Sequence, residues 1–160
     1  MTVQNGASRE ELLCAQLRQA LPGFGGLTEA EAGGLLAAFR CRSVAAQADL
    51  WCSGEPGDSL AFIVSGKIEL QVDTEFPGKQ VVVGVFSRGA VIGTGSVLSH
   101  HPRTSTARVL EDAVVAVLDP RNLEALLQEQ PQAGIKLLKG ILLSESHRLS
   151  KAYARLASVF

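Results

Sequence analysis

Short apolar or alternating runs, broken by glycine, fill the chain between residues 41 and 118. Such runs with turn signals between them predict β-strands, and many short strands in succession are typical of a sandwich, a roll or a barrel. We expect strands at 42–44, 50–52, 60–64, 68–72, 80–86, 91–92, 105–110 and 113–118. The segment 76–79, Phe-Pro-Gly-Lys, predicts the tip of a hairpin. The middle of the chain is therefore predicted to be mainly β.

Helical patterns flank this β region. Residues 10–21 carry apolar side chains at helical intervals, followed by a Pro-Gly pair that ends the segment. Thr28 and Glu31 have the spacing of a capping box, which predicts a helix from there to about residue 39. After the last strand, Asp119 and Pro120 predict the cap and the first position of a helix that reaches about residue 128.

The final helix, which follows Pro131, carries an apolar seam that Glu145 interrupts. The seam predicts a dimer interface made of Ile135, Leu138, Leu142, Leu149 and Leu156. Four of these residues are spaced by seven, and a repeat of seven is typical of a two-stranded coiled coil. A helix of about thirty residues is longer than one roll requires as a cover, so we expect a homodimer. The alternative is a helix that packs only on its own domain.

With 160 residues, the chain fits one domain with an extra helix. We expect an N-terminal helical segment at 1–22, a β-roll at 23–130 and a long helix at 131–160 that serves as a lid or in dimerisation. We expect no direct binding to nucleic acid within this chain.

Charge and cysteine content narrow the class of partner. The net charge is −1, and no basic stretch suggests binding to nucleic acid or to a membrane surface. Cys14, Cys41 and Cys52 are scattered and odd in number, which fits a reducing cytosol better than disulfides or a zinc site. The sequence shows no signal peptide and no apolar run long enough to span a membrane. We therefore expect a soluble, cytoplasmic protein.

A glycine-rich loop at residues 89–107 is the best candidate for a binding site. Gly93 and Gly95 lie between a predicted strand and a short helical turn, where backbone N–H groups can converge on an anion without a Cβ in the way. Arg103 follows in the same loop, and its planar fork of donors matches phosphate oxygens. The pattern predicts a phosphate site.

The segment 50–70, Leu-Trp-Cys-Ser-Gly-Glu-Pro-Gly-Asp-Ser-Leu-Ala-Phe-Ile-Val-Ser-Gly-Lys-Ile-Glu-Leu, resembles the β-roll signature of cyclic nucleotide-binding domains. These domains occur in catabolite-activator-type regulators, protein kinase A regulatory subunits and nucleotide-gated channels. The residues that match the family's turns and the start of its cassette are Gly54, Gly57, Asp58, Gly66 and Gly89. The resemblance covers residues 24 to about 150 and implies a mainly β fold: a double-stranded β-helix, or jelly-roll-like β-roll, with N-terminal helices and a long C-terminal helix.

In this family a phosphate-binding cassette holds the cyclic phosphate, and residues 92–98 and 102–106 align with its two halves. The ligand-binding residues that the resemblance implies are Gly93, Thr94, Gly95, Ser96, Arg103 and Thr104. It implies that Arg103 pairs with the phosphate, that Thr104 donates its hydroxyl, and that backbone donors at 93–96 bind phosphate and sugar. Thr94 stands where the family has a glutamate that accepts the ribose 2′-hydroxyl, a change that weakens binding by very roughly tenfold.

Residues of the final helix approach the purine in this family, so His147 and Arg148 are candidates for contacts to the base. Val81 and Val83 are candidates for the wall of the sugar and base pocket. His100 and His101 are adjacent in an extended segment, so they cannot ligate one ion from one face.

The sequence therefore favours a regulatory, non-enzymatic module that binds cyclic AMP or cyclic GMP and needs no cofactor. The alternative is a degenerate β-roll that binds no nucleotide and serves as a dimerising interaction module.

Overall fold

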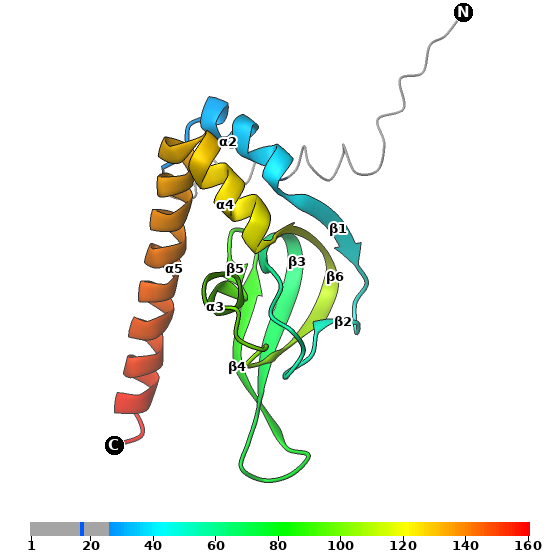
Figure 1. Cartoon of the computed structure of the whole chain (residues 1–160). Helices are drawn as coiled ribbons and strands as arrows, with labels where there is room; N and C mark the ends of the chain where they lie inside the picture. Colours follow the sequence, from blue (N-terminus) through cyan, green and yellow to red (C-terminus); the bar gives the residue numbers. More distant parts are fainter. Residues whose placement is uncertain (1–16, 18–25) are drawn as a thin grey trace, which may run out of the picture.

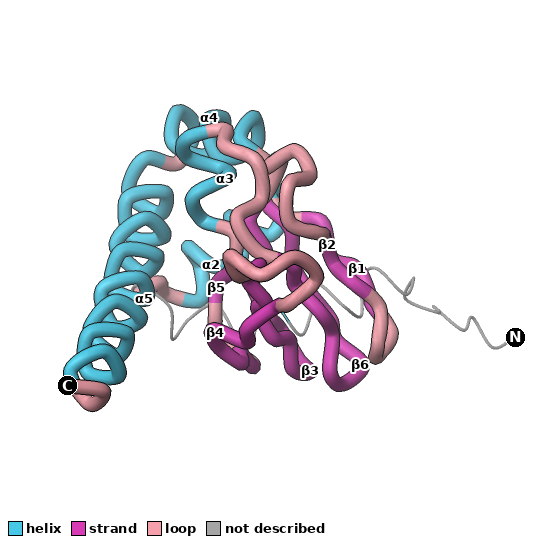
Figure 2. The backbone as a smooth tube through the Cα atoms, turned by 90° about the horizontal axis from the view of Figure 1, so that it is seen from below, coloured by secondary structure: helices cyan, strands magenta, loops and turns pink. Residues whose placement is uncertain are grey.

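The computed structural model describes Leu17 and residues 26–160 (Figure 1). The helix predicted at 10–21 therefore lies outside the described residues, apart from Leu17, which is buried in the core. The elements are α2 (Glu29–Leu35), the 3₁₀ helix η2 (Leu36–Ala38), β1 (Arg40–Val44), β2 (Asp49–Trp51), β3 (Leu60–Asp73), β4 (Gln80–Ser87), β5 (Val91–Ile92), α3 (Thr94–Ser99), β6 (Thr106–Leu118), α4 (Pro120–Glu129) and α5 (Pro131–Ala157). The helices lie together to one side of the strands (Figure 2).

The strands form an antiparallel sheet in the order β1-β6-β3-β4, with β2 added to β6 and β5 added to β3. Two pairs of predicted strands are single long strands, because 60–64 and 68–72 join in β3, and 105–110 and 113–118 join in β6. At Gly66, φ is 87° and a side chain would lie 2.5 Å from the Asp112 carbonyl oxygen, so β3 turns where only glycine fits. The pairing of β3 with β6 shifts register between Ile63 and Ile68, and both long strands continue through this bend.

The first half of β3 is buried on both faces, which explains its unbroken apolar run. Phe62 and its alternate neighbours face the helices, where they pack with residues such as Leu126 and Ile141. Ala61 and Ile63 point to the other side and form the interior of the roll. The predicted β-roll is confirmed, with its core in these two clusters.

Local capping chemistry places the helix starts as predicted. The Thr28 N–H donates to Glu31 Oε2 at 2.9 Å and the Glu31 N–H donates to Thr28 Oγ1 at 3.2 Å, which completes the capping box of α2. The helix then tightens into η2 and ends before Phe39. Asp119 Oδ1 accepts from the Asn122 N–H at 2.8 Å and caps α4, with Pro120 at the first position.

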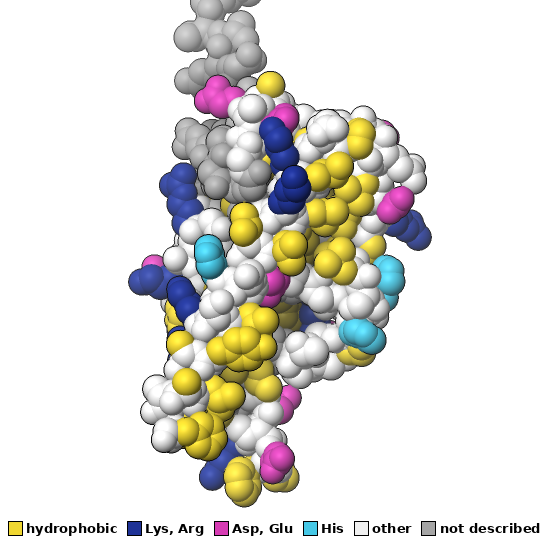
Figure 3. Space-filling model, turned by 90° about the vertical axis from the view of Figure 1, so that its left-hand side faces the viewer, with side chains coloured by type: hydrophobic (Ala, Val, Ile, Leu, Met, Phe, Trp, Pro, Cys, Tyr) yellow, Lys and Arg dark blue, Asp and Glu magenta, His cyan; other side chains and the backbone are white. Residues whose placement is uncertain are grey.

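The long helix α5 is buried only near its start. Its buried residues end at Ile141, although the helix continues to Ala157. The four seam residues spaced by seven are exposed on one face: Ile135 (43%), Leu142 (69%), Leu149 (52%) and Leu156 (59%). Leu138, the fifth residue of the predicted interface, instead packs partly against the core of its own domain. Figure 3 shows hydrophobic side chains gathered on the face that α5 presents.

No helix in the described part of the chain is long and apolar enough to cross a membrane.

Candidate functional site

The predicted cassette, residues 93–104, begins where β5 ends. Gly93 has φ 75° and is the N-cap of α3, and the short helix ends at His100, which has φ 55°. A side-chain Cβ on Gly93 would lie 2.7 Å from Arg103 Nη1 and 3.0 Å from the Trp51 ring. Glycine is therefore required here both by the backbone conformation and by the approach of the arginine. The structure brings two of the sequence-predicted residues, Gly93 and Arg103, into contact.

Arg103 is almost completely buried, with 5% of its surface exposed. Its Nη1 donates to the Ser59 carbonyl oxygen at 2.5 Å, and its Nη2 donates to Asp58 Oδ1 and to Ser59 Oγ, both at 3.1 Å. The guanidinium also stacks on the Trp51 ring, 3.9 Å from its centroid, which is a cation–π contact. Nε is buried and has no hydrogen-bond partner among the described residues.

Arg103 stays charged although it is buried. Burial lowers the pKa of Arg103, and the carboxylate of Asp58 acts in the opposite direction. Because the ordinary arginine pKa is so high, the guanidinium stays protonated at neutral pH. Backbone pairing fixes its place: the Arg103 N–H donates to the Glu55 carbonyl and the Gly54 N–H donates to the Arg103 carbonyl, both at 2.8 Å. The cassette thus presents a buried, oriented cation.

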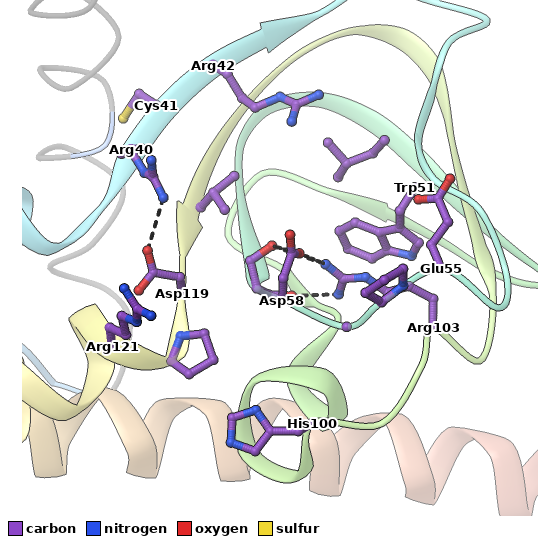
Figure 4. Close-up of a pocket in the computed structure, with 16 residues that line it drawn as sticks. Arg40, Cys41, Arg42, Trp51, Glu55, Asp58, His100, Arg103, Asp119 and Arg121 are labelled. Carbon is purple, nitrogen blue, oxygen red and sulfur yellow. Dashed lines mark hydrogen bonds and ion pairs between the residues drawn. The ribbon is translucent and has the colours of Figure 1, made fainter.

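A cavity of about 1040 Å³ opens beside Arg103 (Figure 4). This volume lies close to the upper limit for pockets that hold small-molecule ligands. Its charged lining residues are Arg40, Arg42, Arg103 and Arg121 and, of opposite sign, Glu55, Asp58 and Asp119. Arg40 Nη2 donates to Asp119 Oδ2 at 3.0 Å, so these two opposite charges neutralise each other. The cavity offers mixed charge, with arginine as its only basic side chain apart from His100.

The first half of the cassette faces α5 instead of this cavity. Thr94 Oγ1 donates to Glu145 Oε1 at 2.9 Å, and Arg148 Nη1 lies 3.1 Å from the same carboxylate oxygen. Arg148 Nη2 donates to the Val91 carbonyl oxygen of β5, and the guanidinium stacks on the Phe86 ring at 4.5 Å from the centroid. The helix is therefore tied to the cassette and to both strands that lead into it.

The other predicted residues divide into buried and exposed ones. Ser96 is buried, and a side chain on Gly57 would lie 2.5 Å from it, so the loop at 57 packs closely on α3. Gly95, Thr104 and His147 are exposed. The wall candidates Val81 and Val83 are about half exposed as well, at 52% and 46%.

Several residues at this site carry no assigned role in the sequence. From sequence, Trp51 is most simply a core or hinge-facing aromatic, and Glu145 is a break in the apolar seam. The stacking of Phe86 with Arg148 joins residues far apart in the chain, and no local pattern announces it. Asp58 had a signal, because it is one of the residues that match the family's turns. Within the described residues, no group of three or more His, Cys, Asp or Glu side chains is placed to hold a metal ion.

The family model for the cyclic nucleotide-binding domain matches residues 41–130. The chain belongs to this family. Among solved structures, a cyclic nucleotide-binding domain from Methylobacillus flagellatus is similar with a TM-score of 0.83 and 23% identity, over 92% of this chain and 84% of that one. The catabolite activator protein of Thermus thermophilus is similar with a TM-score of 0.69 and 25% identity, over 83% of this chain and 61% of that one.

A curated relative, the CRP-like cAMP-activated global transcriptional regulator of Mycobacterium tuberculosis, is 26% identical over 91 residues, which are 56% of this chain and 40% of that protein. This chain spans less than half the length of the first curated relatives that it matches. The match therefore covers only part of each of these relatives.

Proposed function

We propose that this chain is a regulatory, non-enzymatic module that binds cyclic AMP or cyclic GMP at the cassette. The observation that supports it most is the contact between Gly93 and the buried guanidinium of Arg103. A buried arginine with an unpartnered Nε beside a glycine-led turn is an arrangement that suits a phosphate. The role of Thr104 and of the backbone donors at 93–96 belongs to the same proposal.

Asp58 holds the guanidinium of Arg103 in an orientation in which a phosphate can replace the Asp58 carboxylate as its partner. Its carboxylate is 80% exposed while Arg103 is buried, so it can leave for water at little cost. A cyclic phosphate that replaces it exchanges one charge-assisted hydrogen bond for another. Thr94 lacks the family's carboxylate, so affinity for the sugar is lower than the family pattern provides.

In this proposal, residues 23–130 bind the ligand and 131–160 transmit the signal. The hydrogen bond from Thr94 to Glu145 joins the cassette directly to α5, so a movement of the cassette can alter the position of α5. A ligand biases the arrangement of α5 only by its different affinity for the two states. We further propose a homodimer through the exposed seam, because four large apolar residues on one helix face have no cover within the described chain.

The second candidate is a β-roll that binds no nucleotide and acts as a dimerising interaction module. Thr94 in place of the family's glutamate is the observation that favours it. The two functions make opposite predictions for nucleotide binding.

Titration calorimetry with cyclic AMP, cyclic GMP and cyclic di-GMP separates them. We expect wild-type protein to bind a mononucleotide, Arg103→Ala to lose this binding, and the control Arg121→Ala, which lines the same cavity, to keep it. Circular dichroism checks that each variant is folded. If none of the nucleotides binds wild-type protein with a Kd below about 1 mM, the proposed function is wrong.

A further inference from the structure

Polar and stacking contacts hold α5 against the first half of the cassette and against β4 and β5, the strands that lead into it. Glu145 accepts from Thr94 Oγ1 at 2.9 Å, and Arg148 pairs with Glu145, bonds to the Val91 carbonyl and stacks on Phe86. No residue of α5 beyond Ile141 is buried, so these contacts, rather than a hydrophobic core, position this stretch of the helix.

The same contacts use groups that a nucleotide needs. The proposed function assigns the hydroxyl of Thr94 to the sugar, and here a carboxylate oxygen of Glu145 accepts its hydrogen. The Phe86 ring is a flat apolar surface on β4, and a planar guanidinium lies on it as a planar base would. Gly84 leaves room for that ring, since a Cβ there would lie 2.7 Å from Phe86 Cζ.

The contacts that hold α5 are also incomplete, as is expected of a helix that can separate from the cassette. Arg148 Nε is buried and has no hydrogen-bond partner among the described residues. The side chains of Glu145 and Arg148 keep 36% and 28% of their surface exposed, so water can replace their contacts when the helix lifts. A polar network in which one buried donor has no partner holds the helix less tightly than a complete network does.

We propose that Glu145 and Arg148 form an internal plug of the binding site, and that a nucleotide binds by displacing it and stacking its base on Phe86. This rests on the proposed function and names the regulation of the same site. Glu145 occupies the hydroxyl position at Thr94, and Arg148 occupies the stacking face of Phe86. Ligand binding frees α5 beyond Ile141, while Leu137 and Ile141 stay in the core and act as the pivot.

A test without ligand comes first. Hydrogen exchange of the amides at 142–157 is compared in wild type, in the double variant Glu145→Gln with Arg148→Ala, and in the control Ser146→Ala, whose exposed side chain lies on the same turn. Exchange about tenfold faster in the double variant alone supports the plug. Unchanged exchange in the double variant overturns it.

Calorimetry with cyclic AMP and cyclic GMP gives the second readout. We expect the double variant to bind about tenfold more tightly than wild type, and Phe86→Leu to bind more weakly, while Phe76→Leu at the hairpin tip does not change the affinity. Weaker binding by Arg148→Ala alone means that Arg148 is a ligand of the base, and it overturns the plug. If neither wild type nor any variant binds a nucleotide, the proposed function is wrong. The hydrogen-exchange result still decides whether Glu145 and Arg148 hold α5 against the roll.

Discussion

Substituting alanine for Gly93 tests whether the two halves of the cassette support each other. The substitution places a Cβ at a position with φ 75°, 2.7 Å from Arg103 Nη1 and 3.0 Å from the Trp51 ring. The backbone disfavours the new residue, and the guanidinium must move. Because Nη1 and Nη2 hold Ser59 and Asp58, moving the guanidinium breaks charge-assisted hydrogen bonds.

The magnitude follows from these two costs. A residue with a Cβ in the left-handed region costs about 1–2 kcal/mol. Displacing the buried, charged guanidinium from its hydrogen bonds to Ser59 and Asp58 together costs about 1.5–3 kcal/mol more. We therefore expect Gly93→Ala to lower the free energy of unfolding by about 2.5–5 kcal/mol, which is a large part of the stability of a domain of this size.

Urea denaturation followed by circular dichroism measures the effect, with two glycines as controls. Gly89 has φ 88° and no atom within 4 Å of its Cβ position, so Gly89→Ala shows the backbone cost alone. Gly95 lies inside α3 and also has open space, so Gly95→Ala is expected to stabilise by about 0.5–1 kcal/mol.

A second background isolates the arginine. In Arg103→Met, the extra cost of Gly93→Ala over Gly89→Ala is expected to disappear, because no guanidinium remains to be displaced. If Gly93→Ala and Gly89→Ala cost the same in the wild-type background, the two halves of the cassette do not depend on each other, and the reasoning is refuted.

Three further predictions use other contacts. The hydrogen bond from Lys136, and to a smaller extent the capping box, lowers the pKa of Glu31 below its ordinary 4.5. The ionised Glu31 therefore stabilises the fold above that pH, and this contribution is lost as the pH falls further. In thermal unfolding, the melting temperature of Glu31→Gln should fall less steeply than that of wild type below about pH 4.5. Asp58→Asn should lower stability by less than about 1 kcal/mol in urea, since the carboxylate is mostly exposed. Leu142→Lys with Leu149→Lys should halve the mass in light scattering, and an unchanged mass contradicts the dimer.

Local chemistry made much of this fold predictable. Thr28 and Asp119 mark helix starts because a short polar side chain next to a helical pattern satisfies backbone donors. Gly89 and Gly93 mark turns because their positive φ angles favour glycine over residues with a Cβ. The long strands were divided in two by sequence, since Gly66 reads as a turn although pairing to β6 carries the strand through the bend.

The site was less predictable because its partners come from distant segments. Gly93 and Arg103 were placed together by their motif, but the orientation of the arginine depends on Asp58 and Trp51, about fifty residues away. Glu145 interrupted a heptad pattern, and nothing near it in sequence indicated Thr94 as its partner. Periodicity assigns a residue to a helix face, but it does not identify what that face meets.

The geometry of α5 connects this interruption to the proposed signal. Each residue turns the helix by about 100°, so Ile141, Glu145 and Arg148 share one stripe that faces the roll, and Leu142 and Leu149 lie about a quarter of a turn away. Glu145 is therefore no defect of the apolar seam, because it belongs to the other stripe. A helix that lifts from the roll must also turn or shift the adjacent seam, so ligand binding and dimer geometry are coupled through one rigid element. Spin labels placed symmetrically on α5 of a dimer should report a changed distance when nucleotide is added, and in the plug variant that distance should already be shifted without nucleotide.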